Sequence, residues 1–466
     1  MSAPTASERV LPTLNQDGSR RWIRPKPAYG RWWQRRRVTA YALMLLFLLL
    51  PYLKVGGKPA VLLDVPSREF TILGVTFLPT DSLLLMLLLG SIIVSIFIFS
   101  ALFGRVWCGW ACPQTIYMEF VFRPIERWIE KGWSASLRFD KDKGHLHAPR
   151  IFKNTIYAAL AIVLAHTFLA YFVGVAALAR WVRLSPWEHP APFLVMAFTT
   201  VLIFLDFAWF REQTCLIACP YGRWQAALID RQSMIVAYDV KRGEPREHGV
   251  KERSAAAGDC VACNACVLTC PTGIDIRNGV QMECINCTQC MDACDEIMDH
   301  VGKPRGLIRY ASQDSLAGKK RHLLRPRIVL YPLALTLLLG GFVYSIRHRS
   351  LADVTILRSQ AEPFSAEADG RISNQIRVRI GNRTGSDHKY QITIIGAEGG
   401  VVVAPENPLN VAAGDLKTTS LFVVLPGTAF IDGERKVTVK IDDEGKFHGS
   451  YPFNLLGPSS SAGVKP

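Results

Sequence analysis

Five long apolar stretches constrain the fold of this chain more than any other feature of its sequence. They are Val38–Leu53, Leu78–Phe103, Thr155–Ala179, Phe193–Phe210 and Ile328–Ile346. A helix needs roughly 20 apolar residues to cross the hydrocarbon core of a bilayer. The 49% hydrophobic content of the 466 residues is also high for a soluble protein. We therefore predict a multi-span α-helical membrane protein, with a buried core helix as the alternative for any one stretch.

Positive charge is concentrated in alternate segments between these stretches. Arg20–Arg37, Arg105–Lys153 and Arg211–Arg327 are rich in lysine and arginine, whereas Lys54–Asp81 contains few. Cytoplasmic loops of membrane proteins carry an excess of these residues. We therefore expect the basic segments in the cytoplasm and the C-terminus on the opposite side. The net charge of +15 follows this topology pattern, so we expect no nucleic-acid partner.

The expected spans divide the chain into six parts. These are a basic cytoplasmic N-terminus (1–37), four transmembrane helices with two loops (38–210), a cytoplasmic segment (211–327), a fifth transmembrane helix (328–346), a periplasmic domain (347–457) and a disordered tail (458–466). After the fifth helix, short runs of β-branched residues alternate with turns such as Gly399-Gly400 and Asp432-Gly433. Many short strands are typical of a β-sandwich, so we predict an immunoglobulin-like domain at 347–457.

Eight of the twelve cysteines form two quartets with identical internal spacing, at about residues 250–300. The quartets are Cys260-x-x-Cys263-x-x-Cys266-x-x-x-Cys270 and Cys284-x-x-Cys287-x-x-Cys290-x-x-x-Cys294. This is the spacing of bacterial ferredoxins, in which the fourth cysteine of each run ligates the other cluster. The sequence therefore predicts a ferredoxin-like insert with two [4Fe–4S] clusters.

The crossed pattern gives a definite ligand assignment. The first cluster takes Cys260, Cys263, Cys266 and Cys294, and the second takes Cys284, Cys287, Cys290 and Cys270. Zinc is the alternative, but zinc sites favour separate Cys-x-x-Cys knuckles with four ligands per ion. The second quartet departs from the bacterial pattern, because Asp295 and not proline follows its last cysteine. We expect this to change the surroundings of a cluster while its ligands remain.

Four further cysteines form two pairs, each followed by proline. Cys108 and Cys112 form one pair, Cys215 and Cys219 the other, and each pair lies just past the cytoplasmic end of an expected span. Thiolates select Cu(I), zinc or iron–sulfur centres. The alternatives are a reversible disulfide or small side chains packed at helix ends. Two equivalent pairs at equivalent depth favour a metal or redox site.

Single residues give weaker indications of function. His166 lies in an apolar stretch and is a candidate haem ligand, although no second histidine at matching depth is evident. Asp206 is an acid near the cytoplasmic end of an expected span, where it is either functional or simply interfacial. Trp22, Trp32 and Trp33 lie among arginines, as is typical of residues that anchor a membrane interface. The sequence contains no phosphate-binding glycine loop and no dinucleotide fingerprint.

Three motifs, together with the spans and the quartets, resemble those of one family. The motifs are Gly104–Tyr117, Cys219–Gln225 and Tyr238–Arg246. They look like those of the cytochrome c oxidase accessory proteins called CcoG, FixG or RdxA, and the similarity covers nearly the whole chain. The resemblance implies a protein of the bacterial inner membrane that helps to mature a high-affinity haem–copper oxidase by reducing Cu(II) to Cu(I).

The resemblance also implies roles for particular residues and partners. The eight quartet cysteines match the family's cluster ligands, and the four paired cysteines match positions proposed to handle copper. The expected partners are the membrane, a copper ion, a copper-transporting ATPase and oxidase subunits or assembly proteins, while the electron donor is unknown. Besides a cupric reductase, the sequence leaves open a quinol-linked ferredoxin-type electron carrier and a non-catalytic assembly scaffold.

Overall fold

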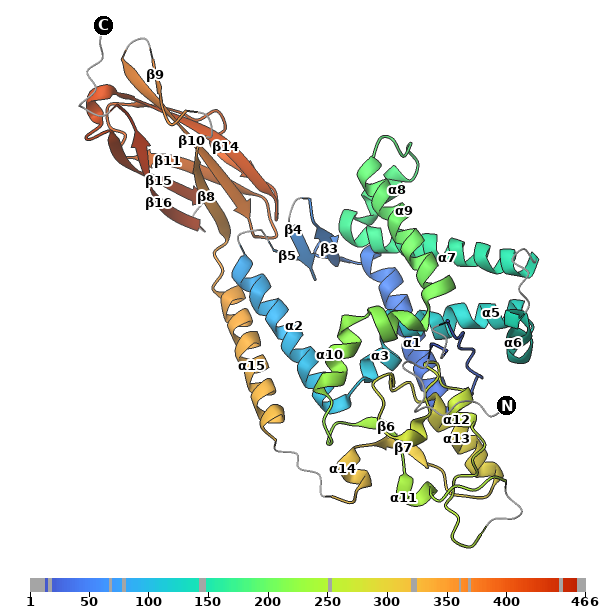
Figure 1. Ribbon diagram of the computed structural model, residues 1–466. Coiled ribbons are helices and arrows are strands. Elements are labelled where there is room, and N and C mark those ends of the chain that lie inside the picture. Colours follow the sequence, from blue (N-terminus) through green and yellow to red (C-terminus); the bar gives the residue numbers. More distant parts are fainter. Residues whose placement is uncertain are drawn as a thin grey trace. The chain divides into compact units, whose positions relative to one another are not determined.

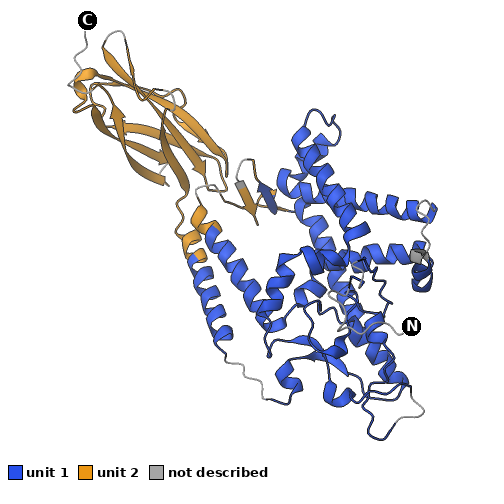
Figure 2. Ribbon diagram, viewed as in Figure 1, with its two compact units in different colours: residues 1–53, 59–64, 86–341 blue, residues 54–58, 65–85, 342–466 orange. Residues whose placement is uncertain are grey.

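The computed structural model of the chain forms two compact units, which are described separately (Figure 2). The described residues are 13–15, 19–66, 69–77, 81–141, 148–249, 254–319, 325–359, 362–367, 370–443 and 447–458. The first unit consists of residues 1–53, 59–64 and 86–341, and the second of residues 54–58, 65–85 and 342–466. The tail that we expect to be disordered, 458–466, lies outside the described residues except for Pro458.

Four helices are long and apolar enough to cross a membrane among the residues described above. They are α2 (Ser82–Phe103), α7 (Ala148–Val173), α9 with its π-helical continuation (Pro190–Phe210) and α15 (Pro326–Arg347). α7 is shorter at its end than we expected, because Gly174 adopts a φ of 77° and starts a new helix, α8 (Val175–Trp181). α7 and α9 lie within the first unit, and so does most of α2 and of α15.

The first expected span differs from the other four. It lies in α1 (Arg31–Leu49), which begins seven residues before Val38 with the sequence RWWQRRR. These arginines lower its mean hydropathy, and α1 is not one of the four membrane-length apolar helices of the described residues. The crossing of α1 therefore stays a prediction.

Short helices and turns connect the long ones. They are α3 (Val106–Trp110), α4 (Pro113–Tyr117), a π-helical turn (Met118–Phe122), α5 (Arg123–Ile129), α6 (Trp133–Lys141), a second π-helical turn (Thr214–Ala218) and α10 (Pro220–Leu228). α4 and α10 each begin at the proline after a cysteine pair. Proline suits a first helical position because its fixed φ is already helical and its missing N–H has no partner there.

The quartet segment folds around a two-stranded antiparallel sheet. Strand β6 (Ile235–Tyr238) pairs with β7 (Ile308–Ala311), with Ile235 opposite Ala311. The helices and turns around the sheet are α11 (Val240–Gly243), α12 (Ala265–Leu268), a 3₁₀ turn (Ile276–Asn278), α13 (Gln289–His300) and α14 (Gln313–Leu316) (Figure 1). Apolar side chains from these elements, among them Met291 and Met298, pack around Cys260 and Cys266. The cysteines therefore take part in the core of this segment.

The second unit contains the predicted immunoglobulin-like sandwich. One sheet has the order β12-β14-β10-β8, with β9 beside β10, and the other has the order β13-β11-β15-β16. The strands are β8 (Ala352–Arg358), β9 (Ser365–Ala366), β10 (Arg371–Asn382), β11 (His388–Ile395), β12 (Val401–Val403), β13 (Leu409–Val411), β14 (Leu416–Pro426), β15 (Glu434–Asp443) and β16 (Phe447–Leu456). Alternate residues of β10, including Ile376, Val378 and Ile380, are fully buried between the sheets. The architecture predicted from the sequence is confirmed.

Five short strands lie between α1 and α2 in the part of the chain that the structure describes. They are β1 (Lys54–Val55), β2 (Lys58–Pro59), β3 (Val61–Asp64), β4 (Glu69–Ile72) and β5 (Val75–Phe77). Within the second unit, β4 and β5 form a hairpin with Phe70 opposite Phe77.

Candidate functional site

The first three cysteines of each quartet lie in a loop, and the two loops share one backbone conformation. In the first loop (Cys260–Cys266), Ala262 and Asn264 have φ angles of 50° and 59°. In the second loop (Cys284–Cys290), Asn286 and Thr288 occupy the equivalent positions and have φ angles of 53° and 63°. This left-handed backbone costs a non-glycine residue roughly 1–2 kcal/mol. Its repetition at matching positions indicates that both loops are shaped around a bound group.

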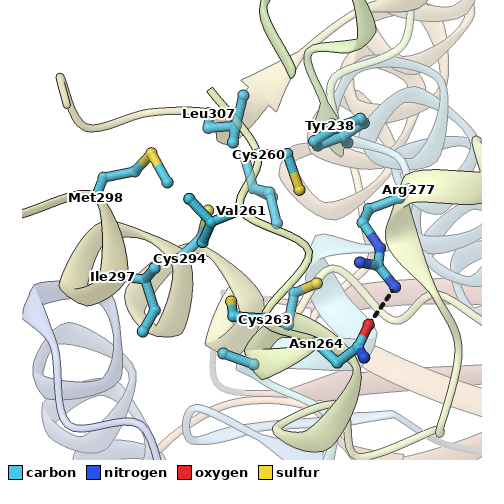
Figure 3. A pocket seen from close by; sticks show the side chains of 13 residues that line it. Tyr238, Cys260, Val261, Cys263, Asn264, Arg277, Cys294, Ile297, Met298 and Leu307 are labelled. Atoms are coloured by element: carbon cyan, nitrogen blue, oxygen red, sulfur yellow. Dashed lines mark hydrogen bonds between the residues drawn. The ribbon is translucent and has the colours of Figure 1, made fainter. Parts of the chain in front are cut away.

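A first cavity lies inside the first loop (Figure 3). Its cysteines are Cys260, Cys263, Cys266 and Cys294. Cys294 is on α13, in the second quartet, and the helix returns it to the first loop. The structure thus brings together the four residues that we assigned to the first cluster.

A second cavity lies inside the second loop. Its cysteines are Cys270, Cys284, Cys287 and Cys290, together with Cys266, which also lines the first cavity. Apolar side chains of Val236, Ile274 and Ile276 form much of the remaining wall. The shared Cys266 shows that the two cavities are neighbours.

The chemistry of both cavities suits [4Fe–4S] clusters. All eight cysteines are free thiols, and four of them surround each space. Burial raises the pKa of Cys266, Cys284 and Cys294 to about 12, so a bound cationic metal centre is needed to hold them as thiolates at neutral pH. Within the described part of the chain, no group of three or more Cys, His, Asp or Glu side chains is arranged to hold a single metal ion.

The motif Tyr238–Arg246 forms one side of the first cavity. Tyr238 lies beside Cys260 (Figure 3), and its hydroxyl donates a hydrogen bond to Glu244 at 3.1 Å. A Cβ at Gly243 would collide with the Tyr238 ring, so only glycine lets the ring sit there. Arg242 is paired with Asp259, the residue before Cys260, at 2.5 Å. This motif therefore fixes the start of the first loop, a role that its sequence did not reveal.

Arg277 is a further lining residue of the first cavity that sequence reasoning missed. Its guanidinium donates to the Asn264 side chain at 2.7 Å (Figure 3) and is ion paired with Asp275, also at 2.7 Å. It thus holds the left-handed Asn264 in place. A single arginine outside any motif carries no spacing signal in the sequence.

The acid that replaces proline after the second quartet has a structural partner. Asp295 accepts a hydrogen bond from the backbone N–H of Gly306 at 2.9 Å, and its other oxygen is 3.4 Å from Arg31. Three residues earlier, Asp292 accepts from the backbone N–H groups of Trp32 and Trp33 at the start of α1. Both acids therefore attach α13 to the N-terminal segment.

This attachment corrects our interpretation of Trp32 as a membrane-interface anchor. Its ring packs edge-on against Tyr310 of β7, with ring centres 5.4 Å apart, and against Trp110, at 6.2 Å. Trp110 lies within the first cysteine pair and donates to the Tyr310 hydroxyl at 3.0 Å. Because Trp32 has protein neighbours on the quartet segment, its place in an arginine-rich stretch was a misleading signal.

The two cysteine pairs come together although about a hundred residues separate them. Cys112 and Cys219 each have extended backbone just before the proline that starts α4 or α10. Cys108, Cys112 and Cys215 all interact electrostatically with Cys219. Burial, together with the neighbouring Cys112 and Cys108, raises the pKa of Cys215 to about 12. We refer to these four residues as the paired cysteines.

The paired cysteines adjoin the second cavity. Cys108 lies in one buried cluster with Ile285 and Cys287 of the second loop. A Cβ on Gly109 would lie 2.5 Å from the carbonyl oxygen of Ile285, so the two chain segments touch backbone to backbone. On the other side, Cys215 lines a third cavity with Ile285 and with Pro271, the residue after Cys270. The paired cysteines therefore meet the second quartet loop at two places.

A buried ion network supports the paired cysteines. Arg211 is 2% exposed and binds both carboxylate oxygens of Glu126, at 2.9 and 3.0 Å. Burial by itself would raise the pKa of Glu126, but Arg211 and Arg24, with Lys153, hold it well below its usual range. Asp206 accepts hydrogen bonds from Gln114 and Thr214, the residue before Cys215. Asp206 thus joins the segments of both cysteine pairs, which gives this intramembrane acid a structural role.

His166 lies in a separate hollow. Its Nδ1 bonds to the carbonyl oxygen of Ile162 at 2.8 Å, and its ring lines a cavity together with His189. Sequence reasoning missed His189 because the depth of a residue at the start of α9 depends on the preceding loop. None of the twelve cysteines, which all lie within the described residues, lines this cavity.

Comparison with known proteins gives matches over most of the chain. Three family models match: "4Fe-4S binding domain" over residues 84–134, "4Fe-4S dicluster domain" over 210–313 and "IG-like fold at C-terminal of FixG" over 342–458. The first contains Cys108 and Cys112, and the second contains the other ten cysteines.

Full-length relatives are also similar to this chain. Protein RdxA of Cereibacter sphaeroides is 33% identical, over 79% of this chain and 80% of the relative. The nitrogen fixation protein FixG of Rhizobium meliloti is 30% identical, over 94% of this chain and 93% of the relative. A crystal structure of a FixG-related protein from Vibrio parahaemolyticus covers 23% of this chain and 97% of that chain, with 11% identity and a TM-score of 0.21.

Proposed function

Because this chain belongs to the FixG/RdxA family of iron–sulfur proteins, we propose that it transfers electrons in a membrane and reduces Cu(II) to Cu(I) at its paired cysteines. When bound in the two cavities, [4Fe–4S] clusters would supply one-electron redox chemistry. The residues that would hold them are the two sets of four cysteines described above. Copper is the substrate in this proposal.

One observation carries the proposal. Cys108 belongs to one buried cluster with Ile285 and Cys287, a lining residue of the second cavity, and Gly109 touches the backbone of the second loop. The two cavities themselves share Cys266. The cysteines thus form a continuous series from the first cavity, through the second, to the paired cysteines. Such a series suits the movement of single electrons in one direction.

The chemistry of the paired cysteines supports copper as the ion that is reduced. Thiolates are soft ligands and bind Cu(I) in preference to Cu(II). A site that binds the reduced ion more tightly favours its formation, by the difference between the two binding free energies. Each Cu(II) takes up one electron to become Cu(I), so a protein that holds two one-electron carriers can reduce about two equivalents.

The place of this reaction in the cell follows from the charge pattern. We propose that the clusters and the paired cysteines face the cytoplasm and that the immunoglobulin-like domain faces the periplasm of a bacterial inner membrane. A copper-transporting ATPase and oxidase subunits or assembly proteins are the partners that this role requires. The electron donor would meet the protein at the first cavity, where Cys263 is exposed.

An anaerobic single-turnover assay tests the proposal. Purified protein is reduced with dithionite, freed of the reductant and mixed with Cu(II), and Cu(I) is measured with a specific chelator. We expect about two Cu(I) per protein, formed while the visible absorbance of the oxidised iron–sulfur centres returns. Reoxidation of the protein by a different acceptor with no response to Cu(II) would rule out the copper role and leave electron transfer intact.

A further inference from the structure

Two buried arginines from outside the quartet segment approach the second loop. Arg36, in α1, is 1% exposed, and Arg105, just after α2, is 3% exposed. A buried arginine keeps its charge and needs a reason to be there, because its transfer from water is costly. No ion pair with a carboxylate is formed by either guanidinium among the residues that the structure describes.

Arg36 lies beside Cys287. Its Nε donates to the carbonyl oxygen of Gly109 at 2.9 Å, and Gly109 rests on Ile285 and Asn286, the two residues before Cys287. Both of its Nη atoms are buried without a hydrogen-bond partner. Its charge reaches both Cys287 and Glu119. Two buried Nη groups without a hydrogen-bond partner, close to the second loop, point to an electrostatic role.

Arg105 lies between the second loop and the paired cysteines. It donates to the carbonyl oxygen of Met282, two residues before Cys284, and its charge acts on Cys108. Its charge also reaches Cys284. A Cβ on Gly222 would lie 2.7 Å from an Arg105 Nη, so glycine at position 222 makes room for the guanidinium. Gly222 of the motif Cys219–Gln225 thus leaves space for the Arg105 guanidinium.

The cations near the first cavity are paired with acids. Arg277, which lines this cavity, is ion paired with Asp275 at 2.7 Å. Arg242 and Lys303 both pair with Asp259, next to Cys260, and Arg31 pairs with Asp295, which follows Cys294. Near the second cavity, by contrast, the acids are already engaged: Glu119 by Arg123 at 2.7 Å, and Asp292 by the backbone N–H groups of α1.

We propose that Arg36 and Arg105 make the second cavity the better place for an added electron, so that electrons collect beside the paired cysteines. An electron adds one negative charge, and nearby positive charge in a low-dielectric interior stabilises it. Burial of the second cavity acts in the opposite direction, and the two unpaired arginines outweigh it. One electron moves from the first cavity to the second, and no bond forms or breaks. The inference rests on the proposed function, which makes the paired cysteines the place where electrons leave.

A redox titration followed by electron paramagnetic resonance tests this inference in the absence of copper. The full-length protein is titrated, and the midpoint potential of each iron–sulfur signal is measured. Replacing Cys263 by serine alters a ligand of the first cavity only and so identifies its signal. Arg36→Gln removes the buried charge, and Arg36→Lys retains it. Arg37→Gln is the control, because Arg37 is only half-buried and lies over the Trp33 ring at 4.8 Å.

We expect the second cavity to have the higher midpoint potential in the wild type. R36Q should lower that potential and leave the first one unchanged, whereas R37Q should change neither and R36K should lie close to wild type. If R36Q does not retain iron, R105Q gives the same comparison. Equal potentials in the wild type, a higher potential for the first cavity, or a shift in R36Q no larger than in R37Q would overturn the inference. Copper takes no part in the titration. The potentials can therefore follow this inference even if the protein does not reduce copper, and copper reduction can occur even if the potentials contradict the inference.

Discussion

Gly109 is the residue at which the first cysteine pair touches the second loop. In Gly109→Ala the new methyl group would lie 2.5 Å from the Ile285 carbonyl oxygen, so the two segments must separate. We expect a loss of about 1–3 kcal/mol of stability from this overpacking. Iron content should remain normal while Cu(I) forms more slowly in the single-turnover assay. Gly340→Ala is the matched control, since its Cβ would meet no atom within 4 Å.

The eight quartet cysteines give a prediction about metal content. Anaerobically purified protein should contain about eight iron atoms, in two four-iron clusters. Because Cys294 lines the first cavity, Cys294→Ser should perturb the same spectroscopic signal as Cys260→Ser and leave the other intact. An iron count near four, or zinc in place of iron, would show that the ligand assignment is wrong.

Residues with a spacing signature were the ones that sequence could identify. The spacing within the two quartets predicted that the last cysteine of each quartet serves the cluster of the other. In the structure, Cys294 lines the first cavity and Cys270 lines the second. Arg36, Arg105 and Arg277 have no such signature. Their contacts join positions far apart in the chain, as in the bond from Arg36 to Gly109 across 73 residues. Only the folded structure brings these charges to the thiols.

At the scale of elements, Arg211 connects the end of α9 to α5. It is the bidentate partner of buried Glu126, which is also paired with Arg24 and Lys153. Arg211→Met removes two charge-assisted hydrogen bonds and should therefore lower stability by about 1.5–3 kcal/mol, measured as the unfolding of detergent-purified protein. Arg223→Met removes an exposed arginine and should change stability by less than about 0.5 kcal/mol. Similar effects of the two variants would mean that the network is not a structural support.

Helix boundaries show which local rules hold and where tertiary contacts take over. The leucine-rich runs predicted α2, α7, α9 and α15, because an uncharged apolar stretch of that length has few other stable environments. The start of α1 was not predictable in this way. It begins at Arg31, where Asp292 of α13 accepts the first backbone N–H bonds in place of a local capping residue. Asp292 is 260 residues from Trp32 in the sequence, so no local pattern around Arg31 could predict this cap.

At the scale of the whole molecule, the charge pattern predicts the topology. Reporter fusions after Asp295 and after Gly457 should lie on opposite sides of the membrane, the first in the cytoplasm and the second in the periplasm. The physical reason is the low positive charge of the loops that would be translocated. If both fusions report the same side, α15, the expected span that lies between the two fusion points, does not cross the membrane.

The central claim is that electrons leave the protein at the paired cysteines to reduce copper. The most direct measurement compares wild type with a variant in which Cys108, Cys112, Cys215 and Cys219 are all serine, and determines iron, bound Cu(I) and the rate of Cu(II) reduction on the same anaerobic samples. A hydroxyl is a poor ligand for Cu(I). We predict wild-type iron content with loss of both Cu(I) binding and copper reduction. A drop in iron would instead assign these thiols to a further iron–sulfur centre, and an unchanged rate of copper reduction would contradict the account.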